Sequence, residues 1–172
     1  MLKLTGALFV FLASVGVGYS QSYELTLREK NLEQFLQVIF CLKGEIRCGN
    51  SSLADAFREA AGRCGKVYKK FLTEAAECME TATAENLETI ISGCAEKHLD
   101  RLKVTKAEFR RIRMLGSRLG YLDKEMQIRQ LELYEEEWKW ILKQLRGELQ
   151  EKKKVYNSLG IMGGIMAVLL FW

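Results

Sequence analysis

Two uncharged, mostly apolar segments constrain the fold of this chain more than any other feature: Leu4–Ser22 and Val155–Trp172. As α-helices, which rise 1.5 Å per residue, they are roughly 27–29 Å long, close to the hydrocarbon thickness of a bilayer. A chain fixed to a membrane at both ends is not organised like a freely diffusing enzyme. We therefore predict two membrane spans, residues 1–22 and 155–172, on either side of one domain formed by residues 23–154.

Each segment also fits a second interpretation. Lys3, the apolar stretch that follows it and the small residues Gly16 and Gly18 are typical of a secretory signal peptide that is later cleaved. The strictly apolar part of the second segment, Leu159–Trp172, is short for a membrane span and also fits a buried core helix. A cleaved signal combined with a C-terminal anchor is therefore the alternative to two spans.

The basic residues next to the two segments indicate the orientation in the membrane. Arg28 and Lys30 follow the first segment and Lys152–Lys154 precede the second, whereas Lys3 is the one basic residue beyond them. By the positive-inside rule, residues 23–154 are expected in the cytoplasm. The lysine triplet also suits the anionic headgroups of membrane lipids, each charge near the surface contributing about 1 kcal/mol.

The central domain carries little excess charge. It holds all 22 acidic residues and 25 of the 26 basic ones, a net charge of 25 − 22 = +3. Without Lys152–Lys154 it is neutral, and nucleic-acid-binding domains show a stronger imbalance, so we expect no nucleic acid as a partner. The five cysteines, an odd number without paired spacing, are more typical of a reducing cytoplasm than of an exported disulfide framework.

The composition of the central domain predicts an all-α fold. Proline is absent from the chain, helix-forming residues dominate, and alternating runs of β-branched residues are missing. Apolar spacing and capping residues predict a cytoplasmic six-helix bundle whose first and last helices continue into N-terminal and C-terminal transmembrane helices. The first expected helix runs to about Arg47, the second covers Leu53–Ala61 and the third covers Lys66–Glu80. The fourth starts near Thr83, the fifth starts at Thr105 and includes Leu119, and the sixth starts after Asp123.

Charge is distributed unevenly between the expected helices. Glu74–Glu96 contains six acidic residues and no basic one, and Arg101–Arg118 contains seven basic residues and one acidic residue, Glu108. Neighbouring helices with complementary solvated faces explain this pattern. A basic docking face for an acidic partner or for lipid headgroups is the alternative.

No arrangement of residues in the sequence predicts catalysis. His98 is the single histidine, and Cys94 lies one helical turn before it, where the two could share a metal ion or form a thiolate–imidazole pair. Two ligands do not make a zinc site, and the CxxC and HExxH spacings and the glycine-rich phosphate loops are absent. We therefore expect no enzyme activity, no cofactor and no metal, with His98 a surface residue beside a small apolar cysteine.

Two pairs of small residues lie in the apolar segments: Ser14 with Gly18, and Gly160 with Gly164. Small residues four positions apart let membrane helices approach closely, within one chain or between chains. Glycine is common in membrane spans, so chance is the alternative to specific packing. Gly116 and Gly120 have the same spacing in a charged context, where we expect a close helix approach and a helix end.

The last expected helix carries apolar residues in steps of three and four, close to a heptad seam. They are Leu131, Tyr134, Trp138, Ile141, Leu145 and Leu149. An intact bundle buries this seam within the chain. The alternative function, a membrane-tethered coiled-coil adaptor, uses it for self-association instead.

Several short motifs follow one another in a characteristic order and spacing: Met1–Leu4, Leu42–Ile46, Ser52–Phe57, Leu115–Gly120 with Asp123 and Gln127, and Tyr156–Gly160 with Gly163. In these motifs the chain resembles the stage III sporulation protein AB family of endospore-forming bacteria. The family usually has proline where this chain has Ser52. A capping serine also starts a helix, so we expect the fold to survive this difference.

This resemblance implies a non-enzymatic subunit of the mother-cell membrane around the forespore, within a channel or secretion-like complex. It also implies a bundle similar to that of the F platform proteins of type II secretion and type IV pilus systems, which bridge an assembly ATPase to the membrane. The implied partners are the ATPase of the complex, stage III sporulation protein AA, and its small membrane subunits. The candidate residues for docking, or alternatively for packing at helix ends, are Glu45, Gly116, Gly120, Asp123 and Gln127.

Overall fold

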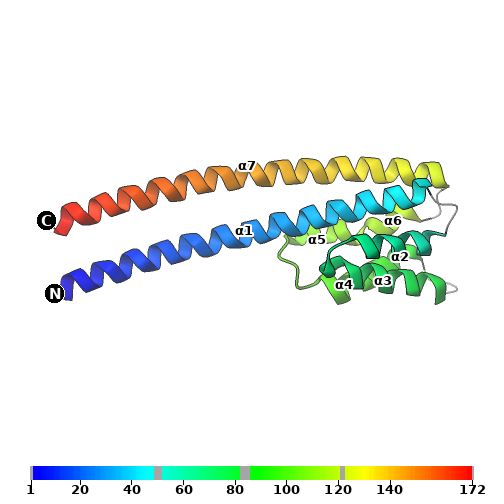
Figure 1. Cartoon of the computed structure of the whole chain (residues 1–172), viewed down its shortest axis with the longest axis horizontal. Helices are drawn as coiled ribbons and strands as arrows, with labels where there is room; N and C mark the ends of the chain where they lie inside the picture. The colour runs from blue at the N-terminus through cyan, green and yellow to red at the C-terminus, as the bar shows by residue number, and fades with distance from the viewer. Residues whose placement is uncertain (1, 49–51, 82–85, 121–122, 172) are drawn as a thin grey trace. The chain divides into compact units, whose positions relative to one another are not determined.

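The computed structural model describes residues 2–48, 52–81, 86–120 and 123–171; of residues 2–22, 153–154, 156–157 and 159–171 it describes the backbone alone (Figure 1). Over this part of the chain the backbone forms helices and short connections without a strand, which confirms the all-α fold class. The helices are α1 (Leu2–Cys48), α2 (Leu53–Arg63), α3 (Lys66–Thr81), α4 (Leu87–Leu99), α5 (Lys106–Arg113), α6 (Leu115–Leu119) and α7 (Lys124–Phe171).

One expected helix is interrupted, so the described residues form one helix more than the expected six. Met114 interrupts the expected fifth helix, so α5 ends at Arg113 and α6 begins at Leu115. The Met114 N–H donates to the carbonyls of Arg110 and Arg111, at 3.2 and 3.1 Å, so the chain tightens here instead of continuing as a regular α-helix. When α5 and α6 are counted as one interrupted helix, the described residues contain six.

Side-chain caps explain where α2 and α5 begin. Ser52 Oγ accepts a hydrogen bond from the Asp55 N–H at 3.2 Å, and an Asp55 carboxylate oxygen accepts one from the Ser52 N–H at 3.1 Å. Thr105 and Glu108 form the same reciprocal pair at 3.2 and 2.7 Å. Such capping boxes satisfy N–H groups that the first turn of a helix leaves without partners. Both predicted helix starts are confirmed.

The start of α4 depends on a residue that the sequence did not single out. Thr83, the predicted cap, lies outside the described residues. Helix α4 begins at Leu87, where the side-chain oxygen of Asn86 accepts the Glu88 N–H at 3.3 Å. Asparagine is among the residues most favoured as a helix N-cap.

The described chain packs as two compact units. One unit is Lys30–Leu142, and the other consists of the residues up to Glu29 together with those from Lys143 onward. Helices α1 and α7 contribute residues to both. Within the second unit, Arg146 Nε on α7 donates to a carboxylate oxygen of Glu29 on α1 at 2.7 Å. The domain boundaries predicted after residues 22 and 154 concern the bilayer and stay predictions.

Among the described residues, no helix contains a stretch that is both long and apolar enough to cross a bilayer. The side chains of four predicted packing residues lie outside the described part of the structure: Ser14, Gly18, Gly160 and Gly164. Their packing, and the two flanking spans to which they belong, therefore stay predictions.

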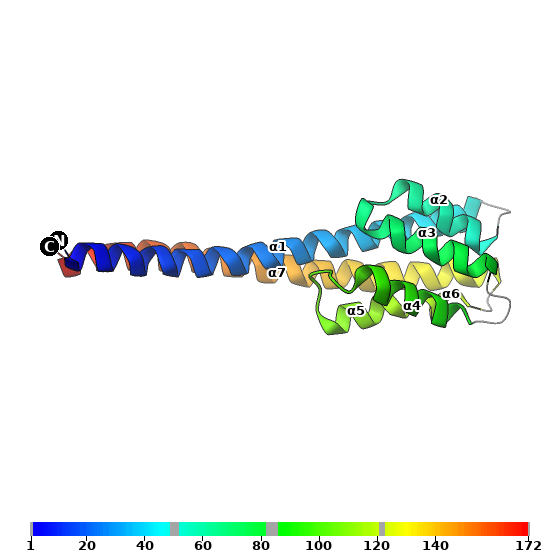
Figure 2. The same cartoon turned by 90° about the horizontal axis from the view of Figure 1, so that it is seen from below.

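Within the unit Lys30–Leu142, helices that follow one another in the sequence are neighbours in space. Helix α3 packs against α2 and α4, and α4 packs against α5 and α6 (Figure 2). The core is apolar, and its largest fully buried side chains are aromatic: Trp138, Tyr68, Tyr134, Phe35, Phe57 and Phe71. Burying aromatic rings of this size supplies much of the stability of a small bundle.

Phe35 on α1 is the centre of an aromatic cluster. Its ring centroid lies 5.7 Å from that of Tyr68 on α3, and 6.1 and 4.9 Å from those of Tyr134 and Trp138 on α7. The two contacts with α7 are edge-to-face, an arrangement that ring quadrupoles favour. The Tyr68 hydroxyl donates to the Asn31 carbonyl at 3.0 Å, so this buried polar group is satisfied. The cluster joins both long helices to α3.

The apolar seam predicted on α7 is buried. Its members that are at most 6% exposed are Leu131, Tyr134, Trp138, Leu145 and Leu149. The prediction is wrong at Ile141, which is half-buried, because Leu142 takes its place in the seam at 3% exposed. A helix has 3.6 residues per turn, so its buried side shifts relative to a strict seven-residue repeat. The surface that the coiled-coil adaptor would use for self-association is thus covered within the chain.

Candidate docking surface

The outward side of α7 in the unit Lys30–Leu142 carries three large apolar side chains. Met126, Leu133 and Trp140 are 43%, 57% and 60% exposed. They are seven residues apart, about two helical turns, so they follow one another along one side of the helix. Single exposed apolar residues are ordinary, whereas a row of them on one helix is typical of a contact surface. We call these three residues the α7 stripe.

In this unit, α7 forms one edge and α3 and α4 form the opposite edge, with α1 between them (Figure 1). Phe40 on α1 adds another exposed apolar side chain, at 63%. Lys43 Nζ lies 5.9 Å from the centroid of the Phe40 ring, within the range of a cation–π contact.

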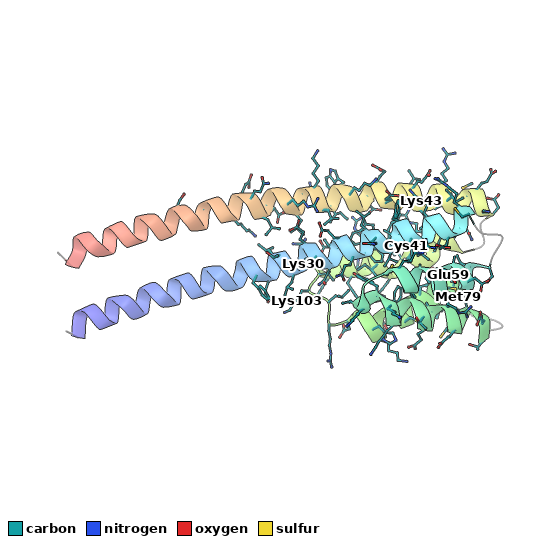
Figure 3. All side chains as sticks on the ribbon, in the orientation of Figure 1. Lys30, Cys41, Lys43, Glu59, Met79 and Lys103 are labelled. Atoms are coloured by element: carbon teal, nitrogen blue, oxygen red, sulfur yellow. The ribbon has the colours of Figure 1, made fainter. Side chains whose placement is uncertain are left out.

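Lys43 also connects α1 to the helix that carries the α7 stripe. It forms an ion pair with Glu135, and Lys139 Nζ lies 2.8 Å from the other oxygen of the same carboxylate. Figure 3 labels Lys43 where α1 and α7 run side by side. A second pair, Arg47 with Glu132 at 2.7 Å, joins the same two helices one turn further along. These ion pairs hold α7, the helix that carries the α7 stripe, against α1.

Glu135 is the buried carboxylate of this network, at 8% exposed. Burial raises the pKa of Glu135, but hydrogen bonds from Lys139 and Lys43 outweigh it, so the pKa lies below its ordinary value. The carboxylate is therefore ionised at neutral pH. Its two lysine partners leave no uncompensated charge in this partly buried contact.

Gly116, one of the residues predicted to dock or to pack, lies where α6 crosses α4. A Cβ atom at Gly116 would fall 2.7 Å from both the Leu87 carbonyl oxygen and the Glu88 Cα. Glycine allows two backbones to approach this closely because it has no Cβ. A Cβ at Gly120 would make ordinary contacts, the nearest at 3.5 Å. Gly120 instead ends α6, its N–H donating to the Gly116 carbonyl at 3.0 Å.

Asp123 and Gln127 connect the end of α6 to the start of α7. Asp123 Oδ1 accepts the Met126 N–H at 2.8 Å, the contact of an N-cap. Gln127 Nε2 donates to the Leu119 carbonyl at 3.0 Å, one of the carbonyls that the end of α6 leaves without a helical partner. Asp123, Gln127 and Gly120 therefore lie at the α6–α7 junction, near which the α7 stripe begins, whereas Gly116 lies at the contact of α6 with α4.

Glu45 belongs to a different contact. Its carboxylate lies 2.9 Å from Arg63 Nη1 and pairs the last turns of α1 with the end of α2. Its side chain is 19% exposed, so little of it is offered to a partner. The contacts described for the five predicted residues are internal to this unit, and a docking role for them stays a prediction.

The α7 stripe is not among the residues predicted from the sequence. Its signal is the seven-residue spacing of Met126, Leu133 and Trp140, which runs parallel to the seam that begins at Leu131. Two apolar rows on one helix share the same repeat. The seam has two apolar positions in each repeat and the stripe has one, so the spacing favours burial of the seam and leaves the stripe as the exposed row.

Ion pairs join the acidic and basic segments noted in the sequence. Arg113 on α5 pairs with Glu96 on α4 at 2.8 Å, as complementary neighbouring helices predict. Arg111 and Arg118 instead contact Glu137 on α7. Part of the basic segment therefore serves the packing of the unit, and a basic docking face stays the alternative for the remainder.

The capped helices, the aromatic core and the exposed stripe define an all-helical bundle protein with a row of exposed apolar side chains on α7. The sequence profile of the stage III sporulation protein AB family matches residues 3–172. The chain therefore belongs to the stage III sporulation protein AB family, as the sequence motifs predicted.

Two relatives show how closely the chain follows this family. Stage III sporulation protein AB of Bacillus subtilis (strain 168) is 22% identical over 170 residues, which span 99% of each chain. A solved structure of a stage III sporulation protein AB has a TM-score of 0.57 at 18% identity and covers 76% of this chain and 97% of that one. The structural likeness shows a shared fold.

Proposed function

We propose that this chain is a non-enzymatic platform subunit of a sporulation complex between mother cell and forespore, and that it docks the ATPase of that complex, stage III sporulation protein AA. Membership of the stage III sporulation protein AB family supports the sporulation role. The observation that carries the docking role is the exposed α7 stripe, formed by Met126, Leu133 and Trp140.

The α7 stripe has the composition of a protein-binding surface. Tryptophan and methionine are enriched at interfaces, and tryptophan is frequent among the residues that dominate binding energy. The exposed carboxylates of Glu132 and Glu136 lie between members of the stripe and supply a polar rim. Because α7 is held to α1 by the Lys43–Glu135 and Arg47–Glu132 pairs, a partner meets a surface that is already ordered.

Attachment to the mother-cell membrane around the forespore is part of the proposal. The helical backbone of α1 and α7 and the lack of charged residues in Leu4–Ser22 and Val155–Trp172 support two membrane spans. The bundle then lies in the cytoplasm, with Lys152–Lys154 against anionic lipid headgroups. The small-residue pairs in the spans would contact each other or the small membrane subunits of the complex.

A pull-down of the purified ATPase by the detergent-solubilised, full-length chain tests the docking. We expect the wild type to retain the ATPase and the double variant Leu133→Ala/Trp140→Ala to bind at least about tenfold more weakly, because truncating a dominant interface residue costs about 2 kcal/mol or more. Val67→Ala is the matched control, since Val67 is an apolar side chain of α3 that is 41% exposed. It should bind like the wild type.

Two further outcomes distinguish the alternatives. Asp123→Lys reverses the charge at the α6–α7 junction, so a loss of binding in this variant alone moves the docking surface to the junction. Circular dichroism confirms that each variant is folded. A folded wild type that does not retain the ATPase contradicts the docking proposal. Self-association of the wild type that the double variant retains favours the adaptor, because the adaptor uses the seam of α7 and not the α7 stripe.

A further inference from the structure

Four side chains with metal-binding atoms come together between α3 and α4. Glu74 and Cys78 lie one turn apart on α3, and Cys94 and His98 lie one turn apart on α4. Residues four apart occupy the same side of a helix, so each helix presents a pair of possible ligands to the other. The ligand atoms of Glu74, Cys78 and Cys94 all lie within 4.8 Å of one another. His98 Nε2 contacts the Glu74 carboxylate directly.

The surroundings of this cluster suit a bound cation. Cys94 is 5% exposed, Cys78 is half-buried, and the side chains of His98 and Glu74 are 18% and 28% exposed. The cluster is thus shielded on the side of the thiols and open to solvent on the side of the histidine and the carboxylate. Lys97 Nζ lies 2.6 Å from the Glu74 oxygen that does not contact His98.

We propose that Glu74, Cys78, Cys94 and His98 bind one soft divalent cation of the zinc class. Two sulfur atoms, one imidazole nitrogen and one carboxylate oxygen form a four-ligand set of the kind that zinc uses in tetrahedral sites. With bonds of about 2.0–2.3 Å, the ligand atoms of such a site are roughly 3.2–3.8 Å apart. The ligand atoms of Glu74, Cys78 and Cys94, all within 4.8 Å of one another, are close to that range, and His98 joins the set through its contact with Glu74.

The charges of the bound state also balance. Cys78 and Cys94 each release a proton to solvent as their sulfur atoms bond to the cation, and His98 binds as the neutral imidazole. Two thiolates, one carboxylate and a divalent cation carry a net charge of −1. The ammonium group of Lys97 beside Glu74 offsets that charge. The direct contact between His98 and Glu74 is replaced by one bond from each residue to the cation.

Such a site would lock α3 to α4. It would do so at the middle of the series of packed helices, since α3 also contacts α2 and α4 also contacts α5 and α6. Binding to the folded chain alone raises the stability of the bundle in proportion to the logarithm of the free cation concentration. The cation is therefore a structural element of the bundle, and not part of a reaction.

The chain contains its own control for this proposal. Cys41 on α1 and Cys64 after α2 form another pair of neighbouring thiols. Among the described residues, Glu74, Cys78 and Cys94 are the one group of at least three potential ligands whose atoms come this close. If binding needs the carboxylate and the imidazole as well as the thiols, the cation should bind between α3 and α4 and not at Cys41 and Cys64.

The experiment is a titration of the full-length, detergent-solubilised chain with Co²⁺, in the presence of a phosphine reductant that keeps the thiols reduced. We expect one equivalent of Co²⁺ to produce the charge-transfer absorption of a cobalt–thiolate bond and the visible bands of tetrahedral cobalt, and we expect Zn²⁺ to displace it. Cys78→Ser/Cys94→Ser should lose these bands, whereas Cys41→Ser/Cys64→Ser should keep them. His98→Ala should weaken binding by about tenfold or more, since even a partner of a ligand contributes about that much.

A stability measurement gives an independent readout. Zn²⁺ should raise the melting temperature of the wild type and of Cys41→Ser/Cys64→Ser, and leave that of Cys78→Ser/Cys94→Ser unchanged. The proposal is overturned if the reduced wild type shows no cobalt–thiolate absorption, because this result does not depend on the folding of any variant. It is equally overturned if Cys78→Ser/Cys94→Ser keeps the absorption. It is also overturned if Cys78 and Cys94 are joined by a disulfide and their thiols, once reduced, bind no metal.

Discussion

Gly116 lies so close to Leu87 that a single methyl group has no room between them. A Cβ atom on Gly116 would be 2.7 Å from the Leu87 carbonyl oxygen, and that oxygen is backbone that cannot rotate away. The contact holds α6 against α4. The glycine spacing that looks like a membrane-helix motif in the sequence thus acts inside the bundle.

Gly116→Ala should destabilise the bundle by about 1–3 kcal/mol, the usual consequence of forcing an extra carbon into a packed contact. Gly120→Ala is the control, because a Cβ there meets ordinary contacts and the backbone is extended. Urea denaturation followed by circular dichroism measures both. Equal stability of Gly116→Ala and the wild type would show that α6 and α4 are further apart than described.

Lys43→Ala should destabilise the bundle more than Arg47→Ala. Both remove a cation of α1 that pairs with a carboxylate of α7, but the side chains of Lys43 and Glu135 are 16% and 10% exposed, against 57% and 47% for Arg47 and Glu132. Leaving a buried carboxylate with one partner fewer costs about 1–3 kcal/mol, whereas an exposed pair contributes about 0–1 kcal/mol. Denaturation midpoints of the two variants give the comparison, and the reverse ranking contradicts it.

The stability of the bundle should fall in acid partly through Glu135. Its pKa is lowered below the ordinary value of 4.5 in the folded chain, so its contribution is complete above that value and is lost as the pH falls through the lower folded pKa. Glu135→Gln should therefore lose less stability than the wild type between neutral pH and pH values below 4.5. Glu136→Gln is the neighbouring control, since the Glu136 side chain is 72% exposed, and it should follow the wild type.

Ser52→Ala should destabilise the bundle by about 0.5–2 kcal/mol, because the first turn of α2 loses the hydroxyl that accepts the Asp55 N–H. Ser117→Ala removes another exposed hydroxyl, one bonded to the Met114 carbonyl, and serves as the comparison. Thermal unfolding of the two variants measures the difference. The φ angle of Ser52 is −64°, the value that a proline ring imposes, so the backbone here has the φ angle of the proline that the sequence resemblance implies at this position.

The sequence predicts those parts of the fold that depend on neighbouring residues. The reciprocal bonds of Ser52 with Asp55 and of Thr105 with Glu108 lie within single turns, so the starts of α2 and α5 could be read from residue types. The break at Met114 could not, since it lies just before the glycine contact of α6 with α4, which arises only in the folded bundle.

The same distinction separates the predicted and unpredicted residues of the two candidate sites. Cys94 and His98 are visible as a pair in the sequence because they lie one turn apart, whereas Glu74 and Cys78 join them only through the packing of α3 on α4. Likewise, the α7 stripe and the buried seam follow the same seven-residue repeat of α7, and the contact of Trp138 with Phe35 places the seam inward.

The aromatic cluster also has a consequence for the order in which the protein is made. Phe35 and Trp138 are separated by 138 − 35 = 103 positions, and Tyr68 and Tyr134 lie between them in the chain. As the chain leaves the ribosome, the apolar side of α1 is made first and stays uncovered until α7 has emerged. Contacts between such distant positions slow folding and prolong the exposure of apolar surface. The aromatic cluster can therefore be completed only after translation has passed Trp138.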